Sequence, residues 1–331
     1  MKSKLINLKN FIGKNKFIKK IYEKKQGCAA IICYHRVITD EENNKNLRPN
    51  GDLSITAKNF EKQICFLKEN FKVVAMDELL IDNKDKFKIA ITFDDGYLDN
   101  FTNALPILTR YNLPATIYIT TGFICREAFA WWLELWNLII EKKIFILKYE
   151  KLNLNEDISS YNLKRKLYLE LAKYFKNLPH AEHKKIFHIL NNNQFKTKFG
   201  DFFLNENQLI LLANSDLITI GAHTHTHPNL KALSYNDCMF EIKKSKDYLE
   251  KILRKKIKHF AYPYGAKEFF SIRESDMLKD MGFSTAVTTL TGQLKKDDNF
   301  FLPRIGLNDF HTNNQIQDKL SGWDNFLKKL I

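Results

Sequence analysis

Two adjacent aspartates, Asp94 and Asp95, stand at the end of an apolar run and are the first candidates for chemistry. The run, residues 89–93, has the composition of a buried strand, so it is expected to deliver both carboxylates to its carboxyl end. Neighbouring carboxylates repel each other and resist removal from water, so the pair needs a cation, a shared proton or open solvent. Gly96 keeps a plainer alternative open, because Asp-Gly is also a common turn signal.

A second candidate cluster is the histidine-rich stretch at residues 221–230. His223 and His227 are four residues apart and share a side in either a helical turn or an extended chain, and His225 joins them if the chain is extended. Neutral imidazole is a good ligand for divalent metals because it needs no charge compensation. Surface histidines also cluster by chance, but together with one aspartate the pair would supply three metal ligands and leave positions open for water and substrate.

These residues belong to an α/β pattern in which predicted strands alternate with predicted helices. Strands are predicted at residues 28–37, 71–76, 89–93, 115–120, 217–223, 257–265 and 284–289. Helices are predicted at residues 56–70, 104–111, 237–253 and 271–281. Such alternation predicts a parallel sheet or barrel, with His35 at the tip of the first strand as Asp94 is at the tip of the third.

The alternation stops between about residues 125 and 212, where a helical insertion is predicted. Its opening cluster of Trp131, Trp132 and Trp136 is expected to form the insertion's own core, with stacking on a sugar as the functional alternative. The chain has 331 residues, enough for one α/β barrel with an insertion, so residues 27–331 are predicted to be one interrupted domain.

The net charge is +14, from 52 Lys plus Arg against 38 Asp plus Glu, so anionic partners are expected. Phosphorylated or lipid-linked sugars and a membrane surface fit this charge. No nucleic-acid partner is expected, because no helix-turn-helix, RRM or zinc-finger pattern is present. Residues 1–26 are predicted to form a basic amphipathic helix, either on an anionic membrane surface or packed on the outside of the domain.

The five cysteines form no C-x-x-C pair, so neither a disulfide framework nor a zinc ribbon is predicted. No apolar run is long enough to span a bilayer, and the N-terminus lacks the apolar core of a secretory signal. These features predict a cytoplasmic location, extended to the inner face of the membrane if the basic N-terminus binds lipid.

Taken in order, five motifs resemble those of the polysaccharide deacetylases, carbohydrate esterase family 4, also called the NodB homology domain. They are YHRV at 34–37, TFDDGY at 92–97, HTHTH at 223–227, FAYPYG at 260–265 and LPRI at 302–305. The first is similar to the opening strand of the subgroup tied to bacterial cell-surface polysaccharide synthesis. The resemblance covers roughly residues 28–125 and 213–310, and it implies a distorted (β/α) barrel of the NodB deacetylase type.

The resemblance also implies a metal-dependent hydrolase that removes an N-acetyl group from an amino sugar. Asp95, His223 and His227 would bind a divalent metal, with zinc as the expected ion. Asp94 would be the general base that takes a proton from the attacking water. The backbone N–H of Tyr264 would help the metal to stabilise the oxyanion.

Two departures from the family pattern leave roles open. Many members have an Arg where this chain has Ala261, and Arg304 is expected to supply that charge from another strand, with a structural ion pair as the alternative. The late Leu-x-His that donates a proton to the leaving amine is absent. His35 is the expected substitute, His225 and His311 are alternatives, and each is otherwise a structural histidine.

The resemblance places Pro263 and Tyr97 with Tyr264 on the substrate or oxyanion side of the site. The expected substrate is an N-acetylated sugar or glycan, nucleotide- or lipid-linked, in a precursor of a cell-surface polysaccharide or lipooligosaccharide. Deformylation or hydrolysis of another amide is one alternative function, and non-catalytic carbohydrate binding is another.

Overall fold

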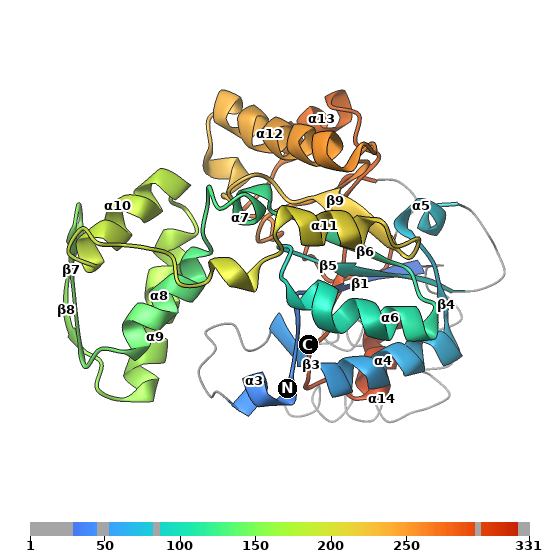
Figure 1. The fold of residues 1–331 in the computed structure, drawn as a ribbon, viewed down its shortest axis with the longest axis horizontal. Coiled ribbons are helices and arrows are strands. Elements are labelled where there is room, and N and C mark those ends of the chain that lie inside the picture. The colour runs from blue at the N-terminus through green and yellow to red at the C-terminus, as the bar shows by residue number, and fades with distance from the viewer. Residues whose placement is uncertain (1–28, 45–52, 82–86, 295–298, 324–331) are drawn as a thin grey trace, which may run out of the picture.

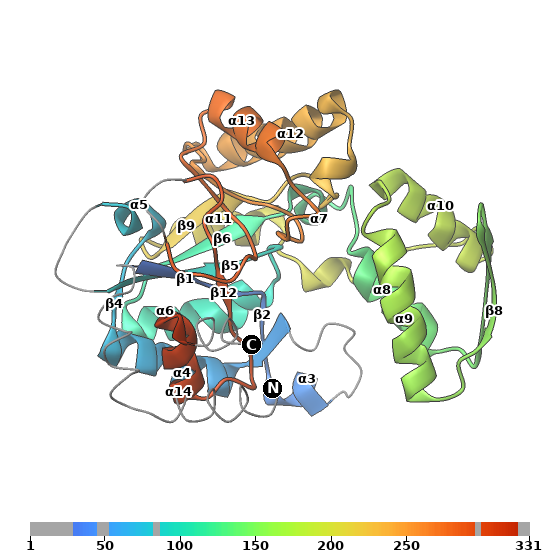
Figure 2. The same cartoon turned by 180° about the vertical axis from the view of Figure 1, so that it is seen from behind.

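The structure is a computed structural model that describes residues 29–44, 53–81, 87–294 and 299–323. The amphipathic helix predicted at residues 1–26 lies outside the described residues. Figures 1 and 2 show a central sheet with helices on both sides and a lobe beside it that contains most of the predicted insertion. Within the described ranges, no helix combines the length and apolar character needed to cross a membrane.

The central sheet is built from parallel strands in the order β11-β10-β9-β6-β5-β1-β12, and β4 also pairs with β5. The strands are β1 (Ala29–Tyr34), β4 (Lys72–Val73), β5 (Lys88–Phe93), β6 (Ala115–Ile119), β9 (Ile218–Ala222), β10 (His259–Ala261), β11 (Thr285–Val287) and β12 (Ile305–Gly306). All residues of β1 and β5 are buried, as expected for parallel strands covered on both faces. Tyr34 lies opposite Phe93, so these two strands end side by side.

One short segment joins the two edges of this sheet. Leu302 pairs in parallel with Val287, the last residue of β11. Three residues later, Ile305 in β12 pairs with Ile32 in β1. The sheet therefore curves into a distorted (β/α) barrel, which confirms the predicted fold.

Helices flank the sheet, and they are α4 (Ala57–Asn70), α5 (Met76–Leu79), α6 (Leu105–Tyr111), α7 (Thr121–Ile124), α11 (Glu206–Ala213), α12 (Tyr235–Leu253), α13 (Ile272–Asp280) and α14 (Asn313–Leu320). A small sheet pairs β2 (Arg36–Ile38) with β3 (Ser54–Thr56), and α3 (Asp40–Asn44) lies between them in the sequence. The start of α4 shows the local cause of helix formation, because the Thr56 hydroxyl accepts a hydrogen bond from the Asn59 N–H. Phe60, Ile64 and Leu67 are then buried at helical spacing.

The lobe contains α8 (Trp131–Ile140), β7 (Ile144–Tyr149), β8 (Leu152–Asp157), α9 (Tyr161–Phe175) and α10 (His180–Leu190). Because β7 and β8 form an antiparallel hairpin, the lobe differs from the wholly helical segment that the sequence predicts. Phe145 and Leu147 on β7 are buried. Ile144 and Ile146, also apolar, are exposed, which hides the period-two pattern of a strand.

Two clusters of buried apolar side chains dominate the described interior. The larger one belongs to the barrel and includes Leu209 and Leu212, so α11 packs on the barrel although it falls in the predicted insertion. The other cluster fills the lobe. Trp131, Trp132 and Trp136 are all buried in it, as predicted for core residues.

Candidate active site

The carboxyl ends of the parallel strands carry most of the predicted site residues. His35 directly follows β1, Asp94 and Asp95 follow β5, and His223 follows β9. Tyr264 lies three residues beyond β10. Because these ends share one rim of a parallel barrel, residues far apart in the sequence meet there.

Asp95, His223 and His227 form a compact, buried cluster. The Nε2 atoms of both histidines lie 3.5 Å from Asp95 Oδ1. His223 Nδ1 lies 2.7 Å from the carbonyl oxygen of Ala261, which assigns the proton to Nδ1 and turns Nε2 toward the aspartate. The structure therefore brings the three predicted metal ligands together.

The surroundings of Asp95 fit a cation. Its Oδ1 is buried and has no hydrogen-bond partner among the described residues. Burial, and then the charge of Asp94, raise the pKa of Asp95 well above its usual value. A divalent ion between this oxygen and the two imidazoles would compensate the buried carboxylate, and aspartate with two histidines is a donor set that zinc accepts.

The backbone around these residues adopts an unusual conformation. Asp95, Thr224, His227 and Tyr264 all have positive φ angles, of 75°, 64°, 59° and 61°. Left-handed backbone is uncommon for residues other than glycine and persists where surrounding contacts hold it. Its concentration at one end of the barrel indicates a site whose loops are fixed by packing.

Glu241 on α12 holds the loop between His223 and His227. Its carboxylate accepts hydrogen bonds from the backbone N–H groups of His225 and Thr226, at 3.0 and 2.7 Å, and from the Thr226 hydroxyl at 2.7 Å. The sequence analysis missed this residue. The sequence offered one clue to it: Glu241 is an acidic residue on the same buried face of a long helix as Cys238 and Ile242.

Asp94 has a different environment from Asp95, because it is bound by Arg304. Both carboxylate oxygens of Asp94 accept hydrogen bonds from the guanidinium, at 2.7 and 2.6 Å. Burial by itself would raise the pKa of Asp94, but Arg304 and the neighbouring His223 and His35 outweigh it and hold the pKa below its usual range. Asp94 therefore stays ionised.

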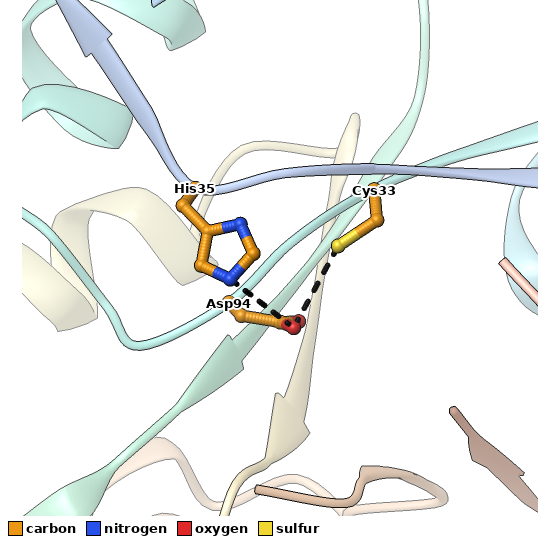
Figure 3. A group of neighbouring side chains, drawn as sticks. All are labelled: Cys33, His35 and Asp94. Atoms are coloured by element: carbon orange, nitrogen blue, oxygen red, sulfur yellow. Dashed lines mark hydrogen bonds and ion pairs between the residues drawn. The ribbon is translucent and has the colours of Figure 1, made fainter. Parts of the chain in front are cut away.

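Figure 3 shows two further side chains directed at the Asp94 carboxylate. Cys33 Sγ lies 3.7 Å and His35 Nε2 lies 3.9 Å from Asp94 Oδ2. Burial lowers the pKa of His35 to about 4, so the imidazole is neutral near pH 7. Cys33 is a neighbour that the sequence analysis did not single out.

The other two histidines considered for proton donation lie elsewhere. His225 Nδ1 is 2.9 Å from the Thr121 hydroxyl, and its Nε2 is 3.0 Å from Glu127. His311 Nδ1 accepts a hydrogen bond from the backbone N–H of Asn308. Of the three candidates, His35 is the one that lines the cavity beside the metal-site residues.

The amino-acid sequence matches a known family over the segments that carry Asp94, Asp95, His223, His227 and Tyr264. A model of the polysaccharide deacetylase family matches residues 81–142 and 171–286. The chain belongs to the polysaccharide deacetylase family. The match passes over residues 143–170, which contain the β7–β8 hairpin and the first ten residues of α9.

Relatives and solved structures are similar to this chain over most of its length. A poly-beta-1,6-N-acetyl-D-glucosamine N-deacetylase of Staphylococcus aureus is 24% identical over 321 residues, which cover 92% of this chain and 86% of the relative. The structure of IcaB from Ammonifex degensii has a TM-score of 0.57 at 18% identity and covers 90% of this chain and 97% of that one. The deacetylase PplD of Streptococcus pyogenes, in complex with acetate, has a TM-score of 0.54 at 20% identity and covers 88% and 97%. These structures support the barrel fold.

In this member of the polysaccharide deacetylase family, the lobe forms one wall of the site. A cavity of about 450 Å³ opens beside the metal-site residues. The lobe residues that line it are Trp131, Trp132, Tyr168, Leu169, Ala172 and Lys176. The predicted core tryptophans thus also reach the site.

Two of the lobe's tryptophans hold tyrosines that the sequence analysis assigned to the substrate side. Trp131 Nε1 donates a hydrogen bond to the Tyr264 hydroxyl at 3.0 Å, and Trp132 Nε1 donates to the Tyr97 hydroxyl at 3.1 Å. Tyr264 lines the cavity, whereas Tyr97 is buried against Trp132 and is not among the lining residues. Pro263 is also buried and precedes Tyr264 without lining the cavity.

Proposed function

We propose that this protein is a metal-dependent N-deacetylase that removes an N-acetyl group from an amino sugar in a precursor of a cell-surface polysaccharide or lipooligosaccharide. The observation that carries the proposal is the different surroundings of two adjacent carboxylates. Asp95 faces two imidazoles, and Asp94 is held ionised by Arg304. One carboxylate suits a ligand and the other suits a base.

Asp95, His223 and His227 would hold the divalent metal, for which zinc is our proposal. When bound, such an ion supplies Lewis-acid stabilisation of the negative charge that develops on the carbonyl oxygen. The backbone N–H of Tyr264 is proposed as a second donor to that oxygen. Tyr264 lines the cavity with a left-handed backbone, and the Trp131 hydrogen bond to its hydroxyl holds its side chain, which supports this assignment.

Asp94 is proposed to accept the proton of the water that attacks the acetamido carbon. Arg304 keeps this carboxylate charged and fixes its orientation through two parallel hydrogen bonds. His35, which is neutral before the reaction, is proposed to accept this proton from Asp94 and to pass it to the leaving amine. Its Nε2 lies 3.9 Å from Asp94 Oδ2 and both residues line the cavity, so a proton taken up by Asp94 has a short route to the amine.

We also propose that the substrate is nucleotide- or lipid-linked and that the protein acts in the cytoplasm at the inner face of the membrane. The net charge of +14 supports an anionic substrate or surface. The name of the Staphylococcus aureus relative supports N-acetylglucosamine as the acylated sugar.

The test is acetate release from N-acetylglucosamine oligomers and from uridine diphosphate N-acetylglucosamine, with protein stripped of metal and reloaded with zinc. We expect release only after reloading. Formate release from N-formyl substrates at a higher rate would instead favour a deformylase.

Substitution of the two aspartates separates their roles. Asp95→Ala should lose zinc, whereas Asp94→Asn should keep zinc and lose turnover by about 10³-fold or more, because the base is removed while the ligands remain. Zinc content by atomic emission and acetate release are measured on the same samples. Turnover that survives Asp94→Asn would reject Asp94 as the base.

A further inference from the structure

The lobe brings one positive charge into the cavity, the ammonium group of Lys176. This residue caps the carboxyl end of α9 and is the only lysine or arginine among the described residues that line the cavity. Its Nζ lies 5.5 Å from the ring centre of Tyr264 and 5.8 Å from that of Phe269. The charge is therefore next to the residue proposed to bind the oxyanion.

Lys176 continues a stripe of α9 residues that faces the cavity. Tyr168, Ala172 and Lys176 follow each other at intervals of four residues, and all three line the cavity. Residues at this spacing share one side of a helix, and eight residues of helix extend about 12 Å. The stripe thus offers an aromatic ring and a small residue followed by a cation.

The ammonium group has no strong ionic partner in the part of the chain that the structure describes. None of the ion pairs found within 4 Å among those residues involves Lys176, which contacts aromatic rings instead. Burial lowers the pKa of Lys176, and Glu268 acts in the opposite direction. A half-buried cation attracts an anion more strongly than an exposed one does, because water screens the charge less.

Glu268 places a negative charge on the same cavity. Its side chain is exposed, and it lines the cavity together with Phe269 and Lys176. An anionic ligand group would be attracted by Lys176 and weakly repelled by Glu268. Removal of the Lys176 charge should therefore weaken the binding of an anionic ligand, and removal of the Glu268 charge should strengthen it.

We infer that Lys176 binds an anionic group that the substrate carries next to the acetamido sugar. The phosphate of a glycosyl phosphate and the carboxylate of a uronic acid both have the required charge. The inference rests on the proposed function, because it assigns a substrate class to the same cavity.

The test measures binding to zinc-loaded, full-length protein by calorimetry in low salt. The probes are glucose analogues with a hydroxyl in place of the acetamido group, which the enzyme cannot deacylate: cellotriose as the neutral probe, uridine diphosphate glucose as the phosphate and cellobiouronic acid as the carboxylate. The variants are Lys176→Met, Lys176→Arg and Glu268→Gln. Lys173→Met is the control, because Lys173 is an exposed residue of the same helix outside the cavity.

Lys176→Met should weaken binding of at least one anionic probe by about tenfold, as expected for loss of a charge-assisted contact, and change cellotriose binding less than about twofold. Lys176→Arg should retain most of the affinity because it keeps the charge. Glu268→Gln should tighten anionic binding by about twofold to threefold, since it removes a screened like charge. The anionic probe whose binding weakens in Lys176→Met identifies phosphate or carboxylate as the recognised group.

Equal effects of Lys176→Met on all probes, or no binding preference of the unsubstituted protein for the anionic probes, would overturn the inference. Acetate release is measured on the same preparation. Release without anion preference would leave the proposed function standing and reject the subsite. Lys176-dependent binding of an anionic probe without any acetate release would leave the anion subsite standing and reject the proposed function.

Discussion

At the residue scale, the pair of adjacent aspartates is separated into two roles by its neighbours. Asp95 has an unpaired buried oxygen beside two imidazoles, and Asp94 has both oxygens bound by Arg304. Burial raises the pKa of both groups, but only Asp94 has an arginine close enough to reverse the effect. Two residues of one type can therefore serve different chemistry within one turn of chain.

Arg304→Lys tests whether the two parallel hydrogen bonds from Arg304 to Asp94 matter for turnover. Lysine keeps a positive charge but cannot make two parallel hydrogen bonds, so we expect kcat to fall by about 10² with zinc content unchanged. Arg36→Lys is the matched control, because Arg36 pairs with Asp99 and does not line the cavity. An unchanged kcat in Arg304→Lys would show that the ion pair between Arg304 and Asp94 has only a structural role.

His35→Gln tests proton delivery to the leaving group. We expect acetate release from the N-acetyl sugar to fall by about 10²-fold, the typical contribution of a positioned acid. An acetate ester with a phenolate leaving group needs no such proton and should be hydrolysed at close to the original rate. His311→Gln, outside the cavity, is the control. Equal losses on amide and ester would exclude His35 as the acid.

At the scale of elements, α12 determines the shape of the loop that carries the proposed metal ligands His223 and His227. Its buried Glu241 carboxylate binds two consecutive backbone N–H groups between His223 and His227. The Thr224 hydroxyl also accepts a hydrogen bond from the His227 N–H. These contacts offset the cost of left-handed backbone at Thr224 and His227.

Glu241→Gln is expected to weaken zinc binding by about 10-fold to 100-fold, because an amide presents a donor where the loop needs an acceptor. Competition with a zinc chelator measures the change. Glu274→Gln is the control, because Glu274 is also a buried acid, and it caps α13 without touching the loop. Glu274→Gln should lower thermal stability and leave the zinc affinity unchanged. Equal zinc affinity in both variants would contradict the positioning role of Glu241.

At the scale of the whole molecule, the proposed metal ligands follow strands that are not neighbours. Asp95 follows β5, His223 follows β9, and β6 lies between these strands in the sheet. An ion bound by both would tie the two halves of the barrel together. The lobe adds a second core on one side, and its tryptophans contact the site from there.

Zinc removal should therefore lower the melting temperature. Ligand at about a thousandfold excess over its Kd stabilises the folded state by about 4 kcal/mol, which corresponds to a shift of roughly 6 °C in a protein of this size. Scanning calorimetry with and without chelator measures the shift. Asp95→Ala is the reference, since its melting temperature should not respond to zinc. A response of Asp95→Ala equal to that of the unsubstituted protein would place the stabilising ion elsewhere.

The sequence by itself predicted seven of the eight strands of the central sheet, all except β12, and the positions of the residues at their tips. Apolar runs that end in Asp94 or His223 are local patterns, and the parallel order follows from their alternation with helices. His35 was predictable for the same reason, because it directly follows the first run.

Only the tertiary structure decided which distant side chains meet. Arg304 reaches Asp94 across 210 residues of sequence because the segment at residues 302–306 closes the barrel. Glu241 lies on α12 and Lys176 caps α9, and the periodicity of these helices shows a buried face but not what that face contacts. Local patterns fix the direction of a side chain relative to its own element, whereas partners depend on how elements pack, and that is a property of the whole chain.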